Sequence, residues 1–163
     1  MATIQFKKGD EYLAKISELE LSVREEVIGP AIYQAGQIAA DAIADEIPRV
    51  PTDESWGSQG DPKRGPKKAE LRAVYNGLGI AKARNDNGFY NVKIGFDGYD
   101  KIPTKRWPKG RPIQMLARSI ERGTTFMKPN PFVKKAMAKI RTQALEKMKT
   151  TVDAEIEKIM KGT

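Results

Sequence analysis

The sequence predicts an α+β fold in which a small antiparallel β-sheet packs against long N-terminal and C-terminal helices. Three observations carry this prediction: an Ala/Ile-rich helical pattern that ends at Ile47, two strand-like runs on either side of residues 84–88, and a long apolar stripe that begins after Pro131. At 163 residues the chain is long enough to bury one core. We therefore expect a single domain, residues 1–163, with inserted loops at about 49–68 and 97–111.

The N-terminal part should contain one short strand and two helices. Thr3 to Phe6 alternates polar and apolar residues, as a short edge strand does, and apolar residues at three- and four-residue spacings from Tyr12 to Leu19 predict a helix. Ser22 then begins a capping-box pattern, so a second helix should run to about Ile47. Pro30 leaves two possibilities: it kinks this helix, or the helix restarts there after Gly29.

The middle of the chain predicts a loop, a short helix and a β-hairpin. Glycines and prolines break any periodicity from Arg49 to Lys68, and Lys67 to Tyr75 suits a short helix closed by Asn76 and Gly77. Leu78 to Ala83 and Tyr90 to Phe96 have strand character, and the Asn and Gly residues of Arg84 to Gly88 suit the turn between them. The second strand should bury one face, made of Val92, Ile94 and Phe96.

Two more helices should follow the second loop. Ile113 to Arg122 predicts a short helix whose Met115, Leu116, Ser119 and Ile120 face inward. From Pro131 to about Met160 an apolar stripe continues for about eight turns. Such a helix outreaches a small core, so it should pack on the chain's own long helix or on another subunit. We favour the first for its N-terminal half and leave the end open.

The link between these two helices is punctuated as a rigid elbow. Gly123 suits a left-handed cap at the end of the first helix. Asn130 suits the N-cap of the next helix and Pro131 its first position, where the missing N–H costs nothing. Phe126 and Phe132 would then be two aromatic anchors, buried in the subunit's own core or in a neighbour.

This link resembles the tail-component family of long-tailed bacteriophages, whose members have Glu, an aromatic residue, Gly-Thr, a spacer, Pro-Phe and an Ala on a C-terminal helix. The helix that ends at Ile47 and Pro48 resembles the family's other recurrent element, whereas Arg122 stands where an aromatic residue is usual. The residues on the pattern are Glu121, Gly123, Thr124, Pro131, Phe132 and Ala136.

The resemblance implies a structural virion protein of the head-to-tail junction, a tail-completion or neck component assembled in the host cytoplasm. Such a protein acts as a homo-oligomeric ring, here expected to be a hexamer, that joins the tail to the head connector. Its expected partners are a tail-terminator or tail-tube protein, the head connector and the tape-measure protein, with nonspecific contact to DNA in the lumen.

Composition argues against most catalytic chemistry. The chain has no cysteine and no histidine, which removes thiolate ligands, disulfides and the commonest general base. Its adjacent carboxylates, such as Asp45 and Glu46, point in different directions on helices and turns, which does not suit an acid/base pair. We expect no enzyme activity, no cofactor, no metal and no membrane contact, because no apolar run approaches the ~20 residues of a membrane span.

The net charge of +8 is unevenly distributed. Residues 1–52 carry 5 basic and 9 acidic side chains, residues 53–111 carry 13 and 7, and residues 112–163 carry 11 and 5. The basic loops could contact DNA phosphates or an acidic protein, or simply form a soluble surface, and we favour the last two. The alternative function is a basic, sequence-nonspecific nucleic-acid-binding module. The candidate contacts are Trp56, Lys63, Arg64, Lys67, Lys68, Lys105, Arg106, Trp107, Lys109 and Arg111.

Overall fold

The computed structural model describes residues 21–52 and 63–161, and these form the expected α+β fold. The predicted strand Thr3 to Phe6, the helix Tyr12 to Leu19 and Trp56 lie outside the described residues. None of the helices in the described ranges combines the length and apolar character of a membrane span. The elements are α2 (Leu21–Glu46), the 3-10 helix η1 (Ile47–Arg49), α3 (Lys68–Gly77), β1 (Leu78–Ile80), β2 (Arg84–Asp86), β3 (Phe89–Asn91), β4 (Ile94–Phe96), α4 (Ile113–Arg122) and α5 (Phe132–Met160).

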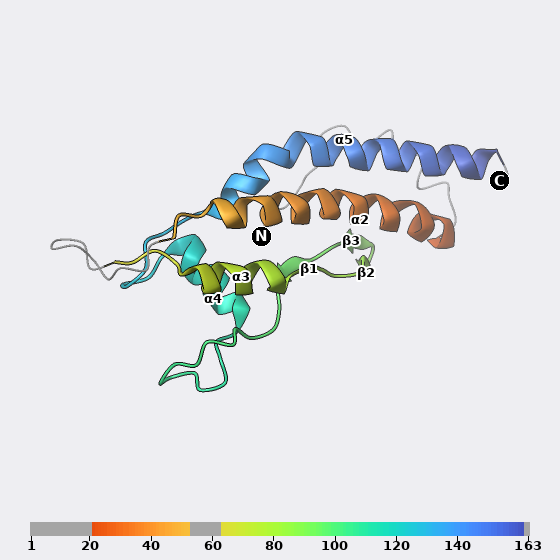
Figure 1. Cartoon of the computed structure of the whole chain (residues 1–163). Coiled ribbons are helices and arrows are strands. Elements are labelled where there is room, and N and C mark those ends of the chain that lie inside the picture. Colours follow the sequence, from red (N-terminus) through yellow and green to blue (C-terminus); the bar gives the residue numbers. More distant parts are fainter. Residues whose placement is uncertain (1–20, 53–62, 162–163) are drawn as a thin grey trace.

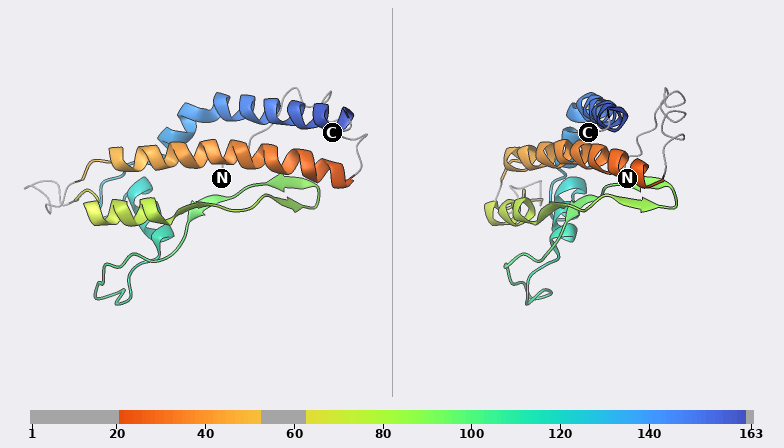
Figure 2. Two further views of the ribbon diagram at one scale, coloured as in Figure 1. Left: turned by 45° about the vertical axis from the view of Figure 1, so that its right-hand side comes forward. Right: turned by 90° about the vertical axis from the view of Figure 1, so that its right-hand side faces the viewer.

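Helix α2 is the central layer of an elongated molecule. Helix α5 runs antiparallel along one side of α2, and the strands with α3 and α4 lie on the other side, as both views of the ribbon show (Figures 1 and 2). A helix covered on two sides must be apolar on two faces. This explains why α2 carries two adjacent apolar stripes, one with Ala31, Ala35, Ile38 and Ala42 and the other with Ile32, Ala39 and Ile43.

Small residues bring α2 and α5 close together. Ala35 and Ala39 of α2 pack with Ile140 and Ala144 of α5, and all four side chains are buried. Further along α5, the Thr151 hydroxyl donates a hydrogen bond of 3.0 Å to the Gln34 side chain. The prediction that the first half of α5 packs on the chain's own long helix is confirmed, and the contact extends at least to Thr151.

Pro30 lies inside α2, nine residues after its start, so the helix does not restart there. The alternative that placed Pro30 at the beginning of a helix is wrong. Pro30 has no N–H to donate to the Glu26 carbonyl, but its own side chain is exposed and displaces no core residue. The rest of α2 continues to Glu46, and Ile47 begins η1.

The predicted hairpin is present, but its strands are shorter and are paired in two blocks. β1 pairs with β4 (Leu78 opposite Phe96), and β2 pairs with β3 (Arg84 opposite Asn91), both antiparallel. Three residues separate β1 from β2, whereas only two separate β3 from β4. The first side of the hairpin therefore has one more residue than the second, which is a β-bulge. The expected strand Leu78 to Ala83 therefore ends at Ile80.

The hairpin turn is narrower than predicted, because Arg84 to Asp86 form β2 instead of loop. Only Asn87 and Gly88 make the turn, with φ of 54° and 89°, as a two-residue type I′ turn requires. Val92, Ile94 and Phe96 are half-buried and alternate with more exposed neighbours, which confirms the predicted inner face. A Cβ at Gly36 of α2 would lie 2.7 Å from Val92, so the helix and hairpin pack closely there.

The larger core cluster lies where the end of α2 meets α3, α4 and the start of α5. Helix α4 has the predicted bounds, although its buried residues are Ile113, Leu116, Ala117 and Ile120. Met115, predicted to face inward, is 47% exposed. The fully buried side chains of this cluster include Ile47, Val74, Leu116, Ile120 and Phe132.

Candidate functional site: the elbow and the basic arm

The elbow between α4 and α5 is held by a carboxylate that caps the second helix from the end of the first. Glu121 accepts hydrogen bonds from the backbone N–H groups of Val133 (2.9 Å) and Lys134 (3.2 Å). The first N–H groups of a helix have no partner within it, and a negative charge there also opposes the helix dipole. Glu121 therefore satisfies the start of α5 and fixes it to α4.

Residues 130–132 form a different cap from the one predicted. Helix α5 begins at Phe132, Pro131 is its N-cap, and Asn130 provides no side-chain cap, so the predicted positions are one residue too early. Pro131 has φ of −77° and ψ of 67°, and the Phe132 N–H donates to the Asn130 carbonyl at 2.8 Å, which is an inverse γ-turn. The Asn130 N–H donates to the Ile120 carbonyl at 2.7 Å and ties this turn to α4.

Gly123 ends α4 with a positive φ of 73°, as predicted, but its ψ of 172° is extended rather than left-handed helical. A Cβ at this position would lie 2.9 Å from the Met127 carbonyl oxygen. Thr124 then closes a tight turn with Met127: its N–H donates to the Met127 carbonyl (2.9 Å), and its hydroxyl accepts from the Phe126 N–H (3.2 Å). Both residues of the Gly-Thr pair therefore have a structural role.

The two predicted aromatic anchors have different environments. Phe132 is 1% exposed and contacts Phe96 edge to face at 6.1 Å between ring centroids, so it belongs to the chain's own core. Ala136, one turn later, is fully buried. Phe126 is 61% exposed and is not an anchor of that core. Apart from Phe126, the elbow residues that the sequence singled out converge on one joint.

The second predicted loop is an ordered arm that protrudes from the body beside α4 (Figures 1 and 2). Its base is closed because the Asp100 N–H donates to the Arg111 carbonyl at 2.9 Å. Gly110 fits tightly against this base: with φ of 96°, a Cβ would lie 1.6 Å from the Asp100 carbonyl oxygen. At the tip, Thr104 and Trp107 exchange two backbone hydrogen bonds of 3.0 Å, and the ring of Trp107 is half-buried.

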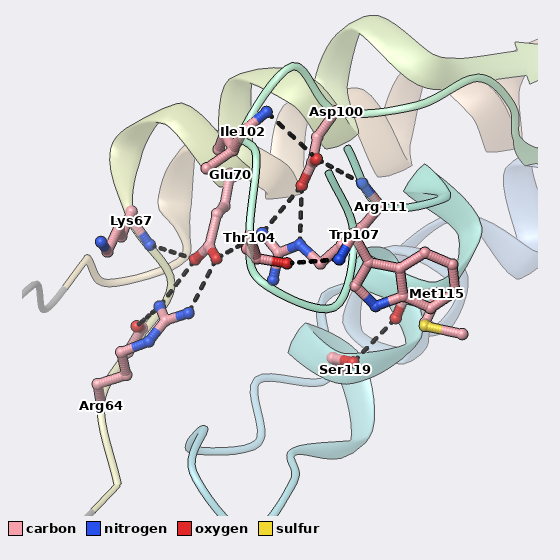
Figure 3. A network of polar contacts seen from close by, with 11 residues as sticks. Arg64, Lys67, Glu70, Asp100, Ile102, Thr104, Trp107, Arg111, Met115 and Ser119 are labelled. Carbon is pink, nitrogen blue, oxygen red and sulfur yellow. Dashed lines mark hydrogen bonds and ion pairs between the residues drawn. The ribbon is translucent and has the colours of Figure 1, made fainter. Parts of the chain in front are cut away.

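A buried carboxylate links this arm to α3 (Figure 3). Glu70 is 2% exposed and accepts both guanidinium hydrogen bonds of Arg64, at 2.8 and 2.9 Å. It also accepts from Arg111 at 2.8 Å and from the Lys67 backbone N–H at 2.8 Å. Arg111 in turn donates to Asp100 from its side chain (2.9 Å) and its backbone (2.7 Å). The Glu70 network consists of Arg64, Lys67, Glu70, Asp100 and Arg111.

The network keeps Glu70 ionised. Burial alone would raise the pKa of Glu70, but the hydrogen bonds from Arg64, the Lys67 amide and Arg111 outweigh it and lower the pKa from 4.5 to about 2. The hydrogen bond to Glu70 likewise raises the pKa of Arg64. The side chains of Arg64 and Arg111 are only 12% and 18% exposed. The structure thus gives these two candidate contacts an internal role, as partners of the chain's own carboxylates.

The other candidate contacts are distributed over the surface. Lys105, Arg106 and Lys109 are exposed on the arm, with the Arg106 guanidinium 6.0 Å from the Trp107 ring centroid. Lys67 and Lys68 are exposed at the start of α3, and Lys63 is half-buried before it. Glu70 and Asp100 were not identified from the sequence as ion-pair partners, although Glu70 is preceded and Asp100 is followed by several basic residues, a setting that favours an internal ion pair.

Two open grooves flank α3. One of about 730 Å³ lies between η1 and α3 and includes Leu71 and Tyr75, and one of about 230 Å³ lies between α2 and β1. Within the described ranges, no three acidic side chains lie close enough to hold a metal ion. No family model matches this sequence, and neither a curated protein nor a solved structure shows significant similarity to it.

Proposed function

We propose that this chain is a structural protein of a bacteriophage virion, a tail-completion or neck component that self-associates as a ring at the head-to-tail junction. Its role would be to assemble with other proteins and not to catalyse a reaction. The partners expected on this proposal are further copies of the chain, a tail-terminator or tail-tube protein and the head connector.

The observation that supports it is the elbow. The six residues of the phage-tail pattern are scattered over 16 positions, yet each has a defined part in one joint. Glu121 caps α5, Gly123 and Thr124 make the tight turn, and Pro131 forms the γ-turn before the helix. Phe132 and Ala136 are buried behind it. A pattern whose members all meet in one place favours a shared folded element over a chance resemblance of short strings.

The arm and the long helices suit a subunit that builds larger objects. The arm is closed at its base by the Glu70 network and reaches away from the body, where a neighbouring molecule can contact it. Helices α2 and α5, at ~1.5 Å per residue, form a rod of roughly 40 Å that gives the subunit a stiff long axis. A ring needs a rigid subunit with two separate contact surfaces, because each copy contacts two neighbours.

The test is direct imaging of the assembly. Purified protein should be examined by mass photometry and negative-stain electron microscopy, alone and mixed with phage tail and connector proteins. We expect closed rings, or added density at the connector-proximal end of tails. A variant with Glu121→Ala, which loosens the elbow, should form fewer such particles than a Glu146→Ala control on the exposed face of α5.

A protein that stays monomeric at all concentrations, never joins tails and still shifts duplex DNA would contradict the proposal. It would instead favour a nucleic-acid-binding module that works without a virion. A monomer that joins tails remains consistent with the proposal, because the ring can form on its partner.

A further inference from the structure

Charge is concentrated at one end of this elongated molecule. Residues 98–145, which form the arm, α4, the elbow and the first half of α5, contain twelve basic and only two acidic residues. The hairpin with the opposite ends of α2 and α5 (residues 21–34, 78–96 and 146–161) contains eight basic and seven acidic residues. These two groups of segments occupy opposite ends of the rod (Figure 1). The molecule therefore has a nearly neutral end and a strongly positive one.

The two acidic residues within residues 98–145 cannot neutralise the surface of these segments, because both are used internally. Asp100 is 1% exposed and is bound by Arg111, and Glu121 caps the backbone of α5. Among the described residues, the exposed lysines and arginines of the arm and α4 make no ion pair. Unneutralised charges of one sign on neighbouring segments sum to a field that attracts polyanions.

The exposed basic side chains of the arm and of α4, two segments that are consecutive in the chain, are together called the basic face. Arg118 and Arg122 are four residues apart and so lie on the same face of α4. The arm leads directly into this helix at Ile113. The basic face consists of Lys101, Lys105, Arg106, Lys109, Arg118 and Arg122, all exposed.

We propose that the basic face binds the phosphate backbone of duplex DNA without reading its sequence. This goes beyond the ring proposal and does not depend on it. Phosphate contacts need cationic side chains that reach outward from a fixed frame, and the closed base of the arm supplies the frame. Arg64 and Arg111, which the sequence alone suggested as contacts, are not part of the face because Glu70 and Asp100 hold them.

Duplex DNA fits the basic face better than an acidic protein does. All six side chains of the face are charged, and charged residues as a class, lysine in particular, are depleted in the cores of protein–protein interfaces. Nonspecific binding to DNA has no such requirement, since it depends on the number of cations that meet phosphates. The residues of the face line neither of the two grooves beside α3, whereas interface hot spots lie in well-packed pockets.

The experiment measures the affinity for a fluorescent 20-bp duplex of random sequence by anisotropy, from 25 to 300 mM salt. For wild type we expect the logarithm of the affinity to fall linearly with the logarithm of the salt concentration, with a slope of about −3.6 to −5.4 for four to six phosphate contacts. The triple variant Lys105→Gln/Arg106→Gln/Lys109→Gln should lower the affinity at 50 mM salt by at least about tenfold. It should also reduce the slope by about 2 to 3.

The matched control removes the same charge from the other end. Lys82→Gln/Lys147→Gln/Lys149→Gln replaces three exposed lysines near the hairpin and on the second half of α5, and should change the affinity by less than about threefold. Circular dichroism of both variants checks that they are folded. Equal losses in the two variants would show that only net charge matters and would overturn the assignment of the face.

Three further results would overturn the proposal that the basic face binds DNA. An arm variant that binds like wild type, or wild-type binding that is insensitive to salt, overturns the proposal. Failure to bind DNA at 25 mM salt together with tight binding of poly-L-glutamate would overturn it in favour of an acidic protein partner. None of these results bears on ring formation, which imaging measures without DNA, so the two proposals fail separately.

Discussion

At the scale of single residues, Glu70 holds two separate segments of the chain together. It is one carboxylate shared by two arginines that come from different segments, the lead-in to α3 and the end of the arm. Removing one member of a buried, hydrogen-bonded charge group leaves its partners desolvated and without a counter-charge. Glu70 should therefore contribute to stability and also hold the arm in place.

We predict that Glu70→Gln lowers the free energy of unfolding by about 2 to 4 kcal/mol. This is in the lower part of the range for breaking a buried ion pair, because Arg111 still has its ion pair with Asp100. Urea unfolding at pH 7 measures the change. Glu26→Gln on the exposed surface of α2 is the control and should change stability by less than about 0.5 kcal/mol. A Glu70 variant as stable as wild type would show that the network contributes nothing net.

The contribution of Glu70 to stability should depend on pH. The pKa of Glu70 is lowered in the folded state, from 4.5 to about 2, so its ionised form stabilises the fold above pH 4.5. This contribution is lost as pH falls from about 4.5 toward 2, where the folded protein also takes up the proton. The stability difference between wild type and Glu70→Gln should be full at pH 7 and less than half as large at pH 3. A difference that stays constant with pH would contradict the assignment.

At the scale of elements, the elbow shows how a helix can be positioned by its neighbour. Helix α5 has no side-chain cap from its own N-cap residue, and Glu121 at the end of α4 takes that part. The start of α5 is therefore stable only when α4 is in place. This contact ties the start of α5 to the end of α4.

We predict that Glu121→Ala destabilises the protein by about 0.5 to 2 kcal/mol, the usual cost of losing an N-cap, and frays the first turn of α5. Hydrogen exchange should show faster exchange at the amides of Val133 and Lys134, which lose their acceptor. Glu146→Ala, at an exposed position of the same helix, controls for the change in helix propensity and should leave those amides protected. Unchanged exchange in the Glu121 variant would refute the capping role.

The elements themselves were largely predictable, because their signals are periodic or local. The bounds of α4, the extent of α5 and the Asn-Gly turn follow from helical spacing and from the few residues that tolerate positive φ. The cap of α5 was misplaced because Glu121 lies 11 residues before Phe132, and no local rule connects them. The same holds for Glu70 and Arg111, which are 41 residues apart. Sequence spacing predicts which faces are apolar, but it does not say which charges meet.

At the scale of the whole molecule, α2 is shared by the two layers. It packs on α5 through alanines and on the hairpin through Gly36, and the end of α2 enters the main core with α3 and α4. Neither layer has a core that is complete without this helix. The arm joins the same body, because Arg111 binds Glu70 of α3, whose Leu71 and Val74 are buried in the core.

We predict that the chain unfolds as one cooperative unit, as expected for a single domain of this size. The chain has two tryptophans, so in a Trp56→Phe background fluorescence reports Trp107 on the arm, while far-ultraviolet circular dichroism reports the helices. Ala144→Leu, which overfills the buried seam between α2 and α5, should destabilise by about 1 to 3 kcal/mol and shift both signals together. Ala138→Leu, at an exposed position of α5, should shift neither. If Ala144→Leu lowers the helical transition but leaves the Trp107 transition in place, the two layers unfold independently and the single-domain prediction is wrong.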